Sequence, residues 1–181
     1  MAFIWPILAI PTSLPAGYRW GATRTTGSTP HAHSGVDLGR YGDTVRAIDT
    51  GKVAFAGQSS GLGGLMVYIN HAGGWQSRYM HLMPSSLKVS TGSSVLRGAN
   101  LGKIGCSGIN NRCTPGGDVA GSHLHFEMLK NCKTVSCNPD RGEGTRVDPE
   151  VALRDSSGPR LFLLAAAATA AYLVVKAFSK G

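Results

Sequence analysis

The sequence predicts an all-β protein, an antiparallel β-sandwich or open barrel, with a hydrophobic helix at its C-terminal end. Three observations support this prediction. The 181 residues include 25 glycines and 9 prolines, which indicates many turns. Short β-like runs recur between turn residues from residue 44 to residue 129, and the Ala/Glu/Lys-rich runs of a helical bundle are absent before residue 160. An uncharged apolar stretch then begins at Leu161.

The predicted strands are short β-like runs at residues 44–48, 52–56, 65–70, 75–80, Val95, 101–104 and 124–129. The first two flank a turn at residues 49–51, and the next two flank a turn at residues 71–74. We therefore expect each of these two pairs to form an antiparallel hairpin.

The ends of the chain differ from its body, residues 19–153. Residues 1–18 are an apolar segment followed by a loop. The apolar part is short, is interrupted by Pro6 and lacks the basic start of a secretory signal. We expect it to pack as a leading strand; the alternative is an anchor that dips into a membrane. Residues 154–160 have the composition of a linker.

Residues 161–178 are predicted to form a transmembrane helix. They carry no charge before Lys176 and would span about 27 Å as a helix, slightly less than a typical hydrocarbon core, with Lys176 reaching the interface. The alternative is a buried or partner-bound Ala-rich helix. Because Arg154 and Arg160 lie on one side and Lys176 and Lys180 on the other, the orientation is left open.

The charge of the chain favours anionic partners. There are 18 Lys and Arg residues against 10 Asp and Glu, a net charge of +8, which suits nucleic acid, acidic lipid headgroups or a polyanionic cell wall. The basic residues are scattered, with no Lys/Arg run and no interleaved aromatic residues, so nucleic-acid binding is not expected. The alternative is a well-solvated basic surface with no specific partner.

Four cysteines predict two disulfides. Pairing Cys106 with Cys113 and Cys132 with Cys137 would staple two short loops and would indicate an oxidising, extracytoplasmic compartment. No C-x-x-C pair is present, which argues against a structural zinc knuckle. The alternative is four free thiols, two of them buried.

Two short motifs bring possible metal ligands together. In H-S-G-V-D, residues 33–37, the first and last side chains lie on the same side of an extended segment, and an imidazole with a carboxylate suits Zn²⁺. In H-L-H-F-E, residues 123–127, alternation points both histidines and the glutamate one way and the apolar residues the other way, towards a core. A further histidine, His81, stands at the end of the strand predicted at 75–80.

These motifs resemble the signatures of the lysostaphin-type zinc metalloendopeptidases, which cleave bacterial peptidoglycan. The family's H-x-G-x-D, Y-x-H-L and G-x-H-L-H-F-E motifs are matched in order by residues 33–37, 79–82 and 121–127. Weaker matches to the family lie at residues 42–47, 70–74 and 147–149. The likeness runs from about residue 19 to residue 153, and it implies the family's fold, antiparallel strands arranged as a duplicated hybrid motif.

The resemblance also implies a role for each matched residue. His33, Asp37 and His125 would be the zinc ligands, and a fourth position would stay open for water. The metal would lower the pKa of that water and polarise the scissile carbonyl. His123 would act as general base and then acid, and His81 would stabilise the oxyanion or orient the water. Which of these two histidines takes the proton first is left open.

Three further residues and one loop have no fixed role in the family motifs. His31 is either an alternative ligand or a solvated loop residue, and His71 is expected to cap its turn. Glu127 either contacts a ligating imidazole or lies exposed at a strand end. The segment between Gly105 and His123 is longer than the family usually has, and we expect a loop stapled by Cys106 and Cys113 that borders the cleft.

The expected function is zinc-dependent hydrolysis of the stem or cross-bridge peptides of peptidoglycan. The domain would be membrane-anchored and extracytoplasmic, facing the periplasm or cell envelope, or part of a phage particle that opens the wall as the phage enters its host. The small size, the hydrophobic tail and the lack of a signal peptide suit the phage protein and also a bacterial tail-anchored enzyme. The alternatives are a catalytically silent scaffold that activates other wall hydrolases and a structural virion component. The bond cleaved, the membrane topology and the oligomeric state are left open.

Overall fold

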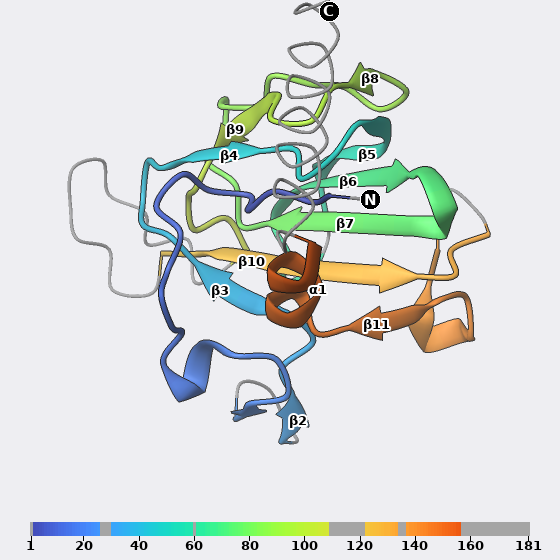
Figure 1. The fold of residues 1–181 in the computed structure, drawn as a ribbon. Helices are drawn as coiled ribbons and strands as arrows, with labels where there is room; N and C mark the ends of the chain where they lie inside the picture. Colours follow the sequence, from blue (N-terminus) through green and yellow to red (C-terminus); the bar gives the residue numbers. More distant parts are fainter. Residues whose placement is uncertain (1, 26–29, 60, 109–121, 134–136, 157–181) are drawn as a thin grey trace, which may run out of the picture.

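The computed structural model has an all-β body, as predicted, over the described residues 2–25, 30–59, 61–108, 122–133 and 137–156 (Figure 1). A short helix, α1, follows the last strand. In chain order the elements are η1 (Ala16–Tyr18), β1 (Thr23–Arg24), β2 (His31–Ala32), β3 (Val36–Leu38), β4 (Thr44–Arg46), β5 (Gly51–Gln58), β6 (Leu65–His71), η2 (Ala72–Gly74), β7 (Trp75–Met80), β8 (Ser94–Val95), β9 (Asn100–Lys103), β10 (Leu124–Lys130), η3 (Pro139–Arg141), β11 (Thr145–Val147) and α1 (Pro149–Ser156).

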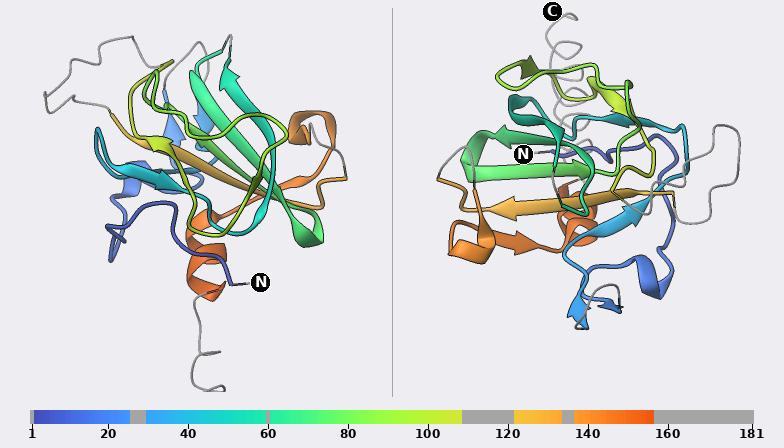
Figure 2. Two further views of the ribbon diagram at one scale, coloured as in Figure 1. Left: turned by 90° about the horizontal axis from the view of Figure 1, so that it is seen from above. Right: turned by 180° about the vertical axis from the view of Figure 1, so that it is seen from behind.

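A seven-stranded antiparallel sheet organises the domain. Its strands follow the order β11-β10-β7-β6-β5-β8, and β3 also pairs with β10. Strand β10 is therefore central: β7 runs along one of its edges, while β3 and β11 share the other edge at opposite ends. Two small ribbons, β1–β2 and β4–β9, complete the strands (Figures 1 and 2).

Alternation along β10 separates the hydrophobic core from the polar site. Leu124, Phe126 and Met128 are fully buried in the core. His125 and Glu127, which lie between them in the sequence, line a cavity instead. The alternation predicted from the H-L-H-F-E motif is confirmed.

The N-terminal segment packs into the core, as predicted. Phe3, Trp5 and Ile7 are only 5%, 4% and 1% exposed. Backbone hydrogen bonds tie the segment to the end of β4 and the residues after it, from Ile4 N–H to the Ile48 carbonyl and from the Arg46 N–H to the Pro6 carbonyl, both at 2.9 Å. The expected strand does not form, because residues 2–5 have no regular structure and residues 6–9 are bends. It lies on the same side of the molecule as α1 (Figures 1 and 2).

Only one of the two expected hairpins forms. Strands β6 and β7 pair on either side of the turn at residues 71–74, as predicted. Strands β4 and β5 do not pair, because β4 pairs with β9 instead. Backbone bonds extend this partnership beyond β4, since Ala47 N–H donates to the Ala99 carbonyl and Gly98 N–H to the Ala47 carbonyl. Residues 49–50 therefore form a corner between two sheets, and the hairpin predicted around residues 49–51 was wrong.

Helix α1 was not predicted, although its start carries a readable signal. Asp148 Oδ1 accepts hydrogen bonds from Glu150 N–H at 2.9 Å and from Val151 N–H at 3.4 Å, and Pro149 occupies the first position of the helix. An acidic cap followed by proline is typical of a helix start. The helix ends at Ser156, so it includes the first three residues of the predicted linker at 154–160.

One predicted disulfide is confirmed: Cys132 and Cys137 are bonded, with their Cα atoms 5.3 Å apart. The other prediction involves Cys113, which lies outside the described residues, together with most of the loop expected to border the cleft. The segment predicted to span a membrane, residues 161–178, lies outside them as well. Within the described part of the chain, no helix has the length and apolar character needed to cross a bilayer.

The packing of the N-terminal segment predicts opposite outcomes for two adjacent substitutions. Ile7→Ala removes a side chain that is 1% exposed and should lower the free energy of unfolding by about 2–5 kcal/mol. Leu8→Ala removes one that is 72% exposed and should change it by less than about 0.5 kcal/mol. Urea unfolding monitored by fluorescence measures both. Equal effects would contradict the packing described here.

Candidate functional site

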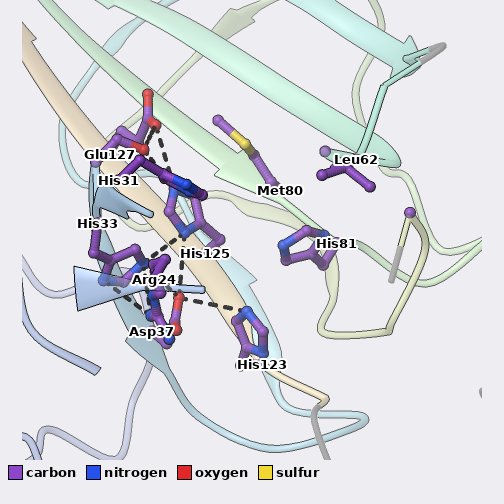
Figure 3. A pocket seen from close by; sticks show the side chains of 13 residues that line it. Arg24, His31, His33, Asp37, Leu62, Met80, His81, His123, His125 and Glu127 are labelled. Carbon is purple, nitrogen blue, oxygen red and sulfur yellow. Dashed lines mark hydrogen bonds and ion pairs between the residues drawn. The ribbon is translucent and has the colours of Figure 1, made fainter. Parts of the chain in front are cut away.

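The three predicted metal ligands converge at the start of β10. His33 lies between β2 and β3, Asp37 lies in β3, and His125 stands directly opposite Asp37 in the β3–β10 pairing. One ligand atom from each lies within 4.8 Å of the others (Figure 3). Gly35 makes this approach possible, because a Cβ there would come within 2.4 Å of the Phe126 carbonyl oxygen and 3.0 Å of His125 Nε2.

The donor atoms of these three residues have a spacing that suits zinc. Asp37 Oδ1 lies 3.1 Å from His33 Nε2 and 3.2 Å from His125 Nδ1, and the two nitrogens are 3.0 Å apart. Ligands placed about 2.0–2.1 Å from a tetrahedral zinc ion are separated by about 3.3 Å. The distances and the chemistry of the donors both fit.

The second nitrogen of each ligand histidine is held by a hydrogen bond. His33 Nδ1 donates to the Arg19 carbonyl oxygen at 2.8 Å, and His125 Nε2 contacts Glu127 Oε1 at 3.3 Å. These bonds turn His33 Nε2 and His125 Nδ1 towards Asp37. Such partners orient the imidazoles of metal sites and fix their tautomers.

The charges of the cluster compensate one another. Burial would raise the pKa of Asp37, but hydrogen bonds from His125 and His33 hold it far below its ordinary value. Burial opposes a charge on His125, yet hydrogen bonds to Asp37 and Glu127 raise the pKa of this imidazole to about 9. The pKa of Glu127 is lowered in spite of burial, chiefly by its hydrogen bond with His125. In the metal-free protein, His125 is thus an imidazolium between two carboxylates.

The two predicted catalytic histidines lie beside this cluster. His123 Nε2 is 3.4 Å from Asp37 Oδ1, and the rings of His81 and His123 meet edge to face with centroids 5.0 Å apart. His81 follows β7 with a left-handed backbone, φ 63°, held by bonds from its N–H to the Gly63 carbonyl and from Gly105 N–H to its own carbonyl. The structure therefore brings all five predicted site residues together.

His81 has a defined tautomer. Its Nδ1 donates to the Ser107 carbonyl oxygen at 2.9 Å, so Nε2 is the nitrogen that keeps a lone pair. Burial, followed by the charge of His123, lowers the pKa of His81 to about 4. At neutral pH this imidazole is uncharged and can accept a hydrogen bond through Nε2.

An open cavity of about 620 Å³ is lined by the ligand histidines His33 and His125 and by His81 and His123. Figure 3 shows these side chains. Asp37 of β3 and His125 and Glu127 of β10 contribute polar side chains to its lining. Leu62 and Met80 contribute an apolar part, and Leu62 is 76% exposed. The lining of the cavity therefore combines a polar ligand cluster with a small apolar part.

Glu127 makes the contact with a ligating imidazole that was one of its two predicted roles. It is only 3% exposed, so the strand-end alternative was wrong. Ser34 Oγ donates to its Oε1 at 2.5 Å. Its other oxygen, Oε2, faces two arginines, Arg78 at 3.5 Å and Arg146 at 3.9 Å.

The remaining predicted histidines have different surroundings. His31 is exposed at the rim of the cavity and is not part of the ligand cluster. His71 does not cap its turn, so that prediction was wrong. It is buried, its Nδ1 donates to the Thr50 carbonyl oxygen at 3.0 Å, and its Nε2 lies 2.8 Å from Ser77 Oγ. The ring therefore links β7 to the corner before β5.

Sequence reasoning missed Arg24. This arginine, at the end of β1, forms an ion pair with Asp37 Oδ2 and lines the cavity. It lies outside every motif of the sequence analysis. Its separation of 13 positions from Asp37 is too long for a local pattern to connect the two residues. Only the path of the β1–β2 ribbon places it there.

The chain is similar in sequence to a family of peptidases and to individual members of known sequence. The profile of Peptidase family M23 matches residues 31–139. Protease LasA of Pseudomonas aeruginosa (strain UCBPP-PA14) is 33% identical over 126 residues, which are 66% of this chain and 29% of LasA. The beta-lytic metalloendopeptidase of Lysobacter enzymogenes is 26% identical over 153 residues, 82% of this chain and 84% of that protein.

Among solved structures, the catalytic domain of the antimicrobial peptidase lysostaphin from Staphylococcus simulans is similar. It is 30% identical with a TM-score of 0.57, over 76% of this chain and 90% of that domain. The chain thus spans most of this domain and of the beta-lytic enzyme but only 29% of the length of LasA.

The charge compensation at His125 can be measured directly. Glu127→Gln keeps the shape of the side chain and removes one of the two carboxylates that stabilise the imidazolium. The pKa of His125 in the metal-free protein, about 9, should fall by about 1–3 units. An NMR titration of the histidine ring nitrogens measures it, with His71 as the internal control. A pKa of His125 that stays unchanged would refute the electrostatic role of Glu127.

Proposed function

We propose that the chain, which belongs to peptidase family M23, is a zinc-dependent endopeptidase that hydrolyses the peptides of bacterial peptidoglycan. The family expected from the motifs, the lysostaphin-type peptidases, is the one found. The observation that carries the proposal is the convergence of His33, Asp37 and His125, with two further histidines, on one wall of an open cavity.

His33, Asp37 and His125 would hold the zinc ion. When bound, zinc supplies a Lewis acid that polarises the scissile carbonyl and lowers the pKa of a water molecule. Three protein ligands leave one position open, which is the arrangement of catalytic rather than structural zinc sites.

The two other histidines would move or hold protons. His123 lies next to the ligand set and is partly exposed to the cavity, so we assign it the role of general base and then general acid. His81 has its Nδ1 proton engaged by Ser107 and keeps a lone pair on Nε2. Of the two roles considered for it, accepting a hydrogen bond from the attacking water fits this tautomer better than donating to an oxyanion.

The substrate proposed is a stem or cross-bridge peptide. Two of the similar proteins are described as a peptidase and a metalloendopeptidase. The net charge of +8 would favour adsorption to an anionic envelope, by forces that weaken as salt increases. The Cys132–Cys137 disulfide supports an oxidising, extracytoplasmic location. Anchoring by residues 161–178 and action in a phage particle are finer parts of the proposal and rest on sequence alone.

The alternative functions receive less support. A catalytically silent scaffold, or a structural virion component, would tolerate loss of metal ligands. Here the three ligands and both accessory histidines are present, and their side chains face one another.

Digestion of purified peptidoglycan tests the activity. The 181-residue chain should release new amino termini from stem or bridge peptides, and mass spectrometry of the products identifies the bond. His123→Ala should keep its zinc and lose about 10²–10⁴-fold in rate. His125→Ala should lose both zinc and activity, and His31→Ala, outside the ligand cluster, should keep its zinc. If the wild type holds zinc but cuts no type of wall, the scaffold alternative replaces the enzyme.

Zinc binding should release protons. His125, with a pKa of about 9 in the metal-free protein, must lose its proton to serve as a ligand, so binding at pH 7 should release about one proton from this residue. Zinc affinity should therefore increase with pH up to about 9. Calorimetry in buffers with different ionisation enthalpies measures the release. An affinity that is the same at pH 6 and pH 8 would contradict the assignment of His125.

A further inference from the structure

Arg24 is fixed beside the ligand set by the same backbone that presents His33. In the β1–β2 ribbon, Arg24 stands opposite His31. Backbone bonds extend the ribbon towards the site, because His33 N–H donates to the Ala22 carbonyl at 2.8 Å and Gly21 N–H to the His33 carbonyl at 2.9 Å. The position of the arginine relative to the first ligand is thus set by the main chain.

The guanidinium of Arg24 divides the two oxygens of Asp37 between different partners. Its Nη2 donates to Oδ2 and lies 3.0 Å from each ring nitrogen of His33. The other oxygen, Oδ1, is the one within 3.1 Å of His33 Nε2 and 3.2 Å of His125 Nδ1. The side chains of Asp37 and Arg24 are 4% and 27% exposed, so water competes little for Oδ2.

We propose that Arg24 is a positioning residue, which occupies Oδ2 of Asp37 so that only Oδ1 is presented to the metal. This inference rests on the proposed zinc site. Without the guanidinium, the carboxylate could rotate about its Cβ–Cγ bond. It could also offer both oxygens to the metal, and the second oxygen would then fill the position that a water molecule needs. Residues that orient metal ligands through hydrogen bonds typically change metal affinity by about 10–100-fold when they are replaced.

Charge and positioning predict opposite results for the loss of Arg24. A cation beside the site repels zinc, so by Coulomb's law alone its removal would strengthen binding. If orientation of the carboxylate is the dominant effect, removal weakens binding. The direction of the change therefore separates the two explanations without any measurement of catalysis.

The test is the zinc affinity of the 181-residue chain, measured by competition with a chromophoric chelator. Arg24→Ala should bind zinc about 10–100-fold more weakly than the wild type. Arg24→Lys keeps a charged donor at this position. Its zinc affinity should lie between those of the wild type and Arg24→Ala. Arg40→Ala removes the same charge from an exposed position outside the cavity and should stay within about twofold of the wild type, because exposed charges are screened.

Cobalt substitution reports on the geometry. The Co²⁺ form of the wild type should show the intense visible absorption of a tetrahedral ion, and Arg24→Ala should show the weaker absorption of a higher coordination number. Near-ultraviolet circular dichroism of the metal-free proteins confirms that the variants are folded, and Arg24→Lys carries the test if Arg24→Ala does not fold. An affinity of Arg24→Ala equal to or higher than that of the wild type, with the same cobalt spectrum, overturns the positioning role alone. A wild type that binds no zinc overturns the proposed function and this inference together.

Discussion

Strands β3 and β10 pair so that Asp37 stands directly opposite His125, and the rest of the site is arranged around this pair. The pairing brings the two metal-ligand motifs together, since His33 precedes β3 and His123 precedes β10. It also depends on Gly35, because any larger residue would push the two strands apart. The core residues Leu124 and Phe126 hold β10 from its other face.

The two buried carboxylates of the site, Asp37 and Glu127, are each surrounded by hydrogen-bond donors and basic side chains. Asp37 is surrounded by three imidazoles and a guanidinium, and Glu127 by an imidazolium, a hydroxyl and two arginines. Each carboxylate is buried, and a buried charge without partners would cost several kcal/mol. One of the two arginines, Arg78, also donates to the carbonyl of Cys137. A line of contacts thus runs from the disulfide through Arg78 and Glu127 to the ligand His125.

The sequence predicted those features that depend on local pattern. Alternation in residues 123–127 placed both histidines and Glu127 on one face, and the turn at 71–74 identified the β6–β7 hairpin. The failures concern contacts between residues far apart in the chain. His71 was expected to cap its own turn, but its ring bonds to Thr50, which is 21 positions away. Local propensity cannot identify such a partner, because it is chosen by the packing of separate strands.

The partner of β4 and the role of Arg24 were missed for the same reason. Strand β4 pairs with β9, where Val45, Ala47 and Ile48 are buried, and nothing in the local sequence distinguishes β9 from β5 as its neighbour. Arg24 belongs to a strand of two residues, too short to show any alternation.

The separation of 88 positions between Asp37 and His125 has a consequence for biosynthesis. His33 and Asp37 leave the ribosome early, whereas His125 emerges only after β4 to β9 have been translated. Closing so long a loop is slow, because its entropy must be lost before the distant contacts form. Before His125 emerges, a growing chain consequently carries only two of the three residues of this cluster, so the cluster cannot assemble until β10 has been made.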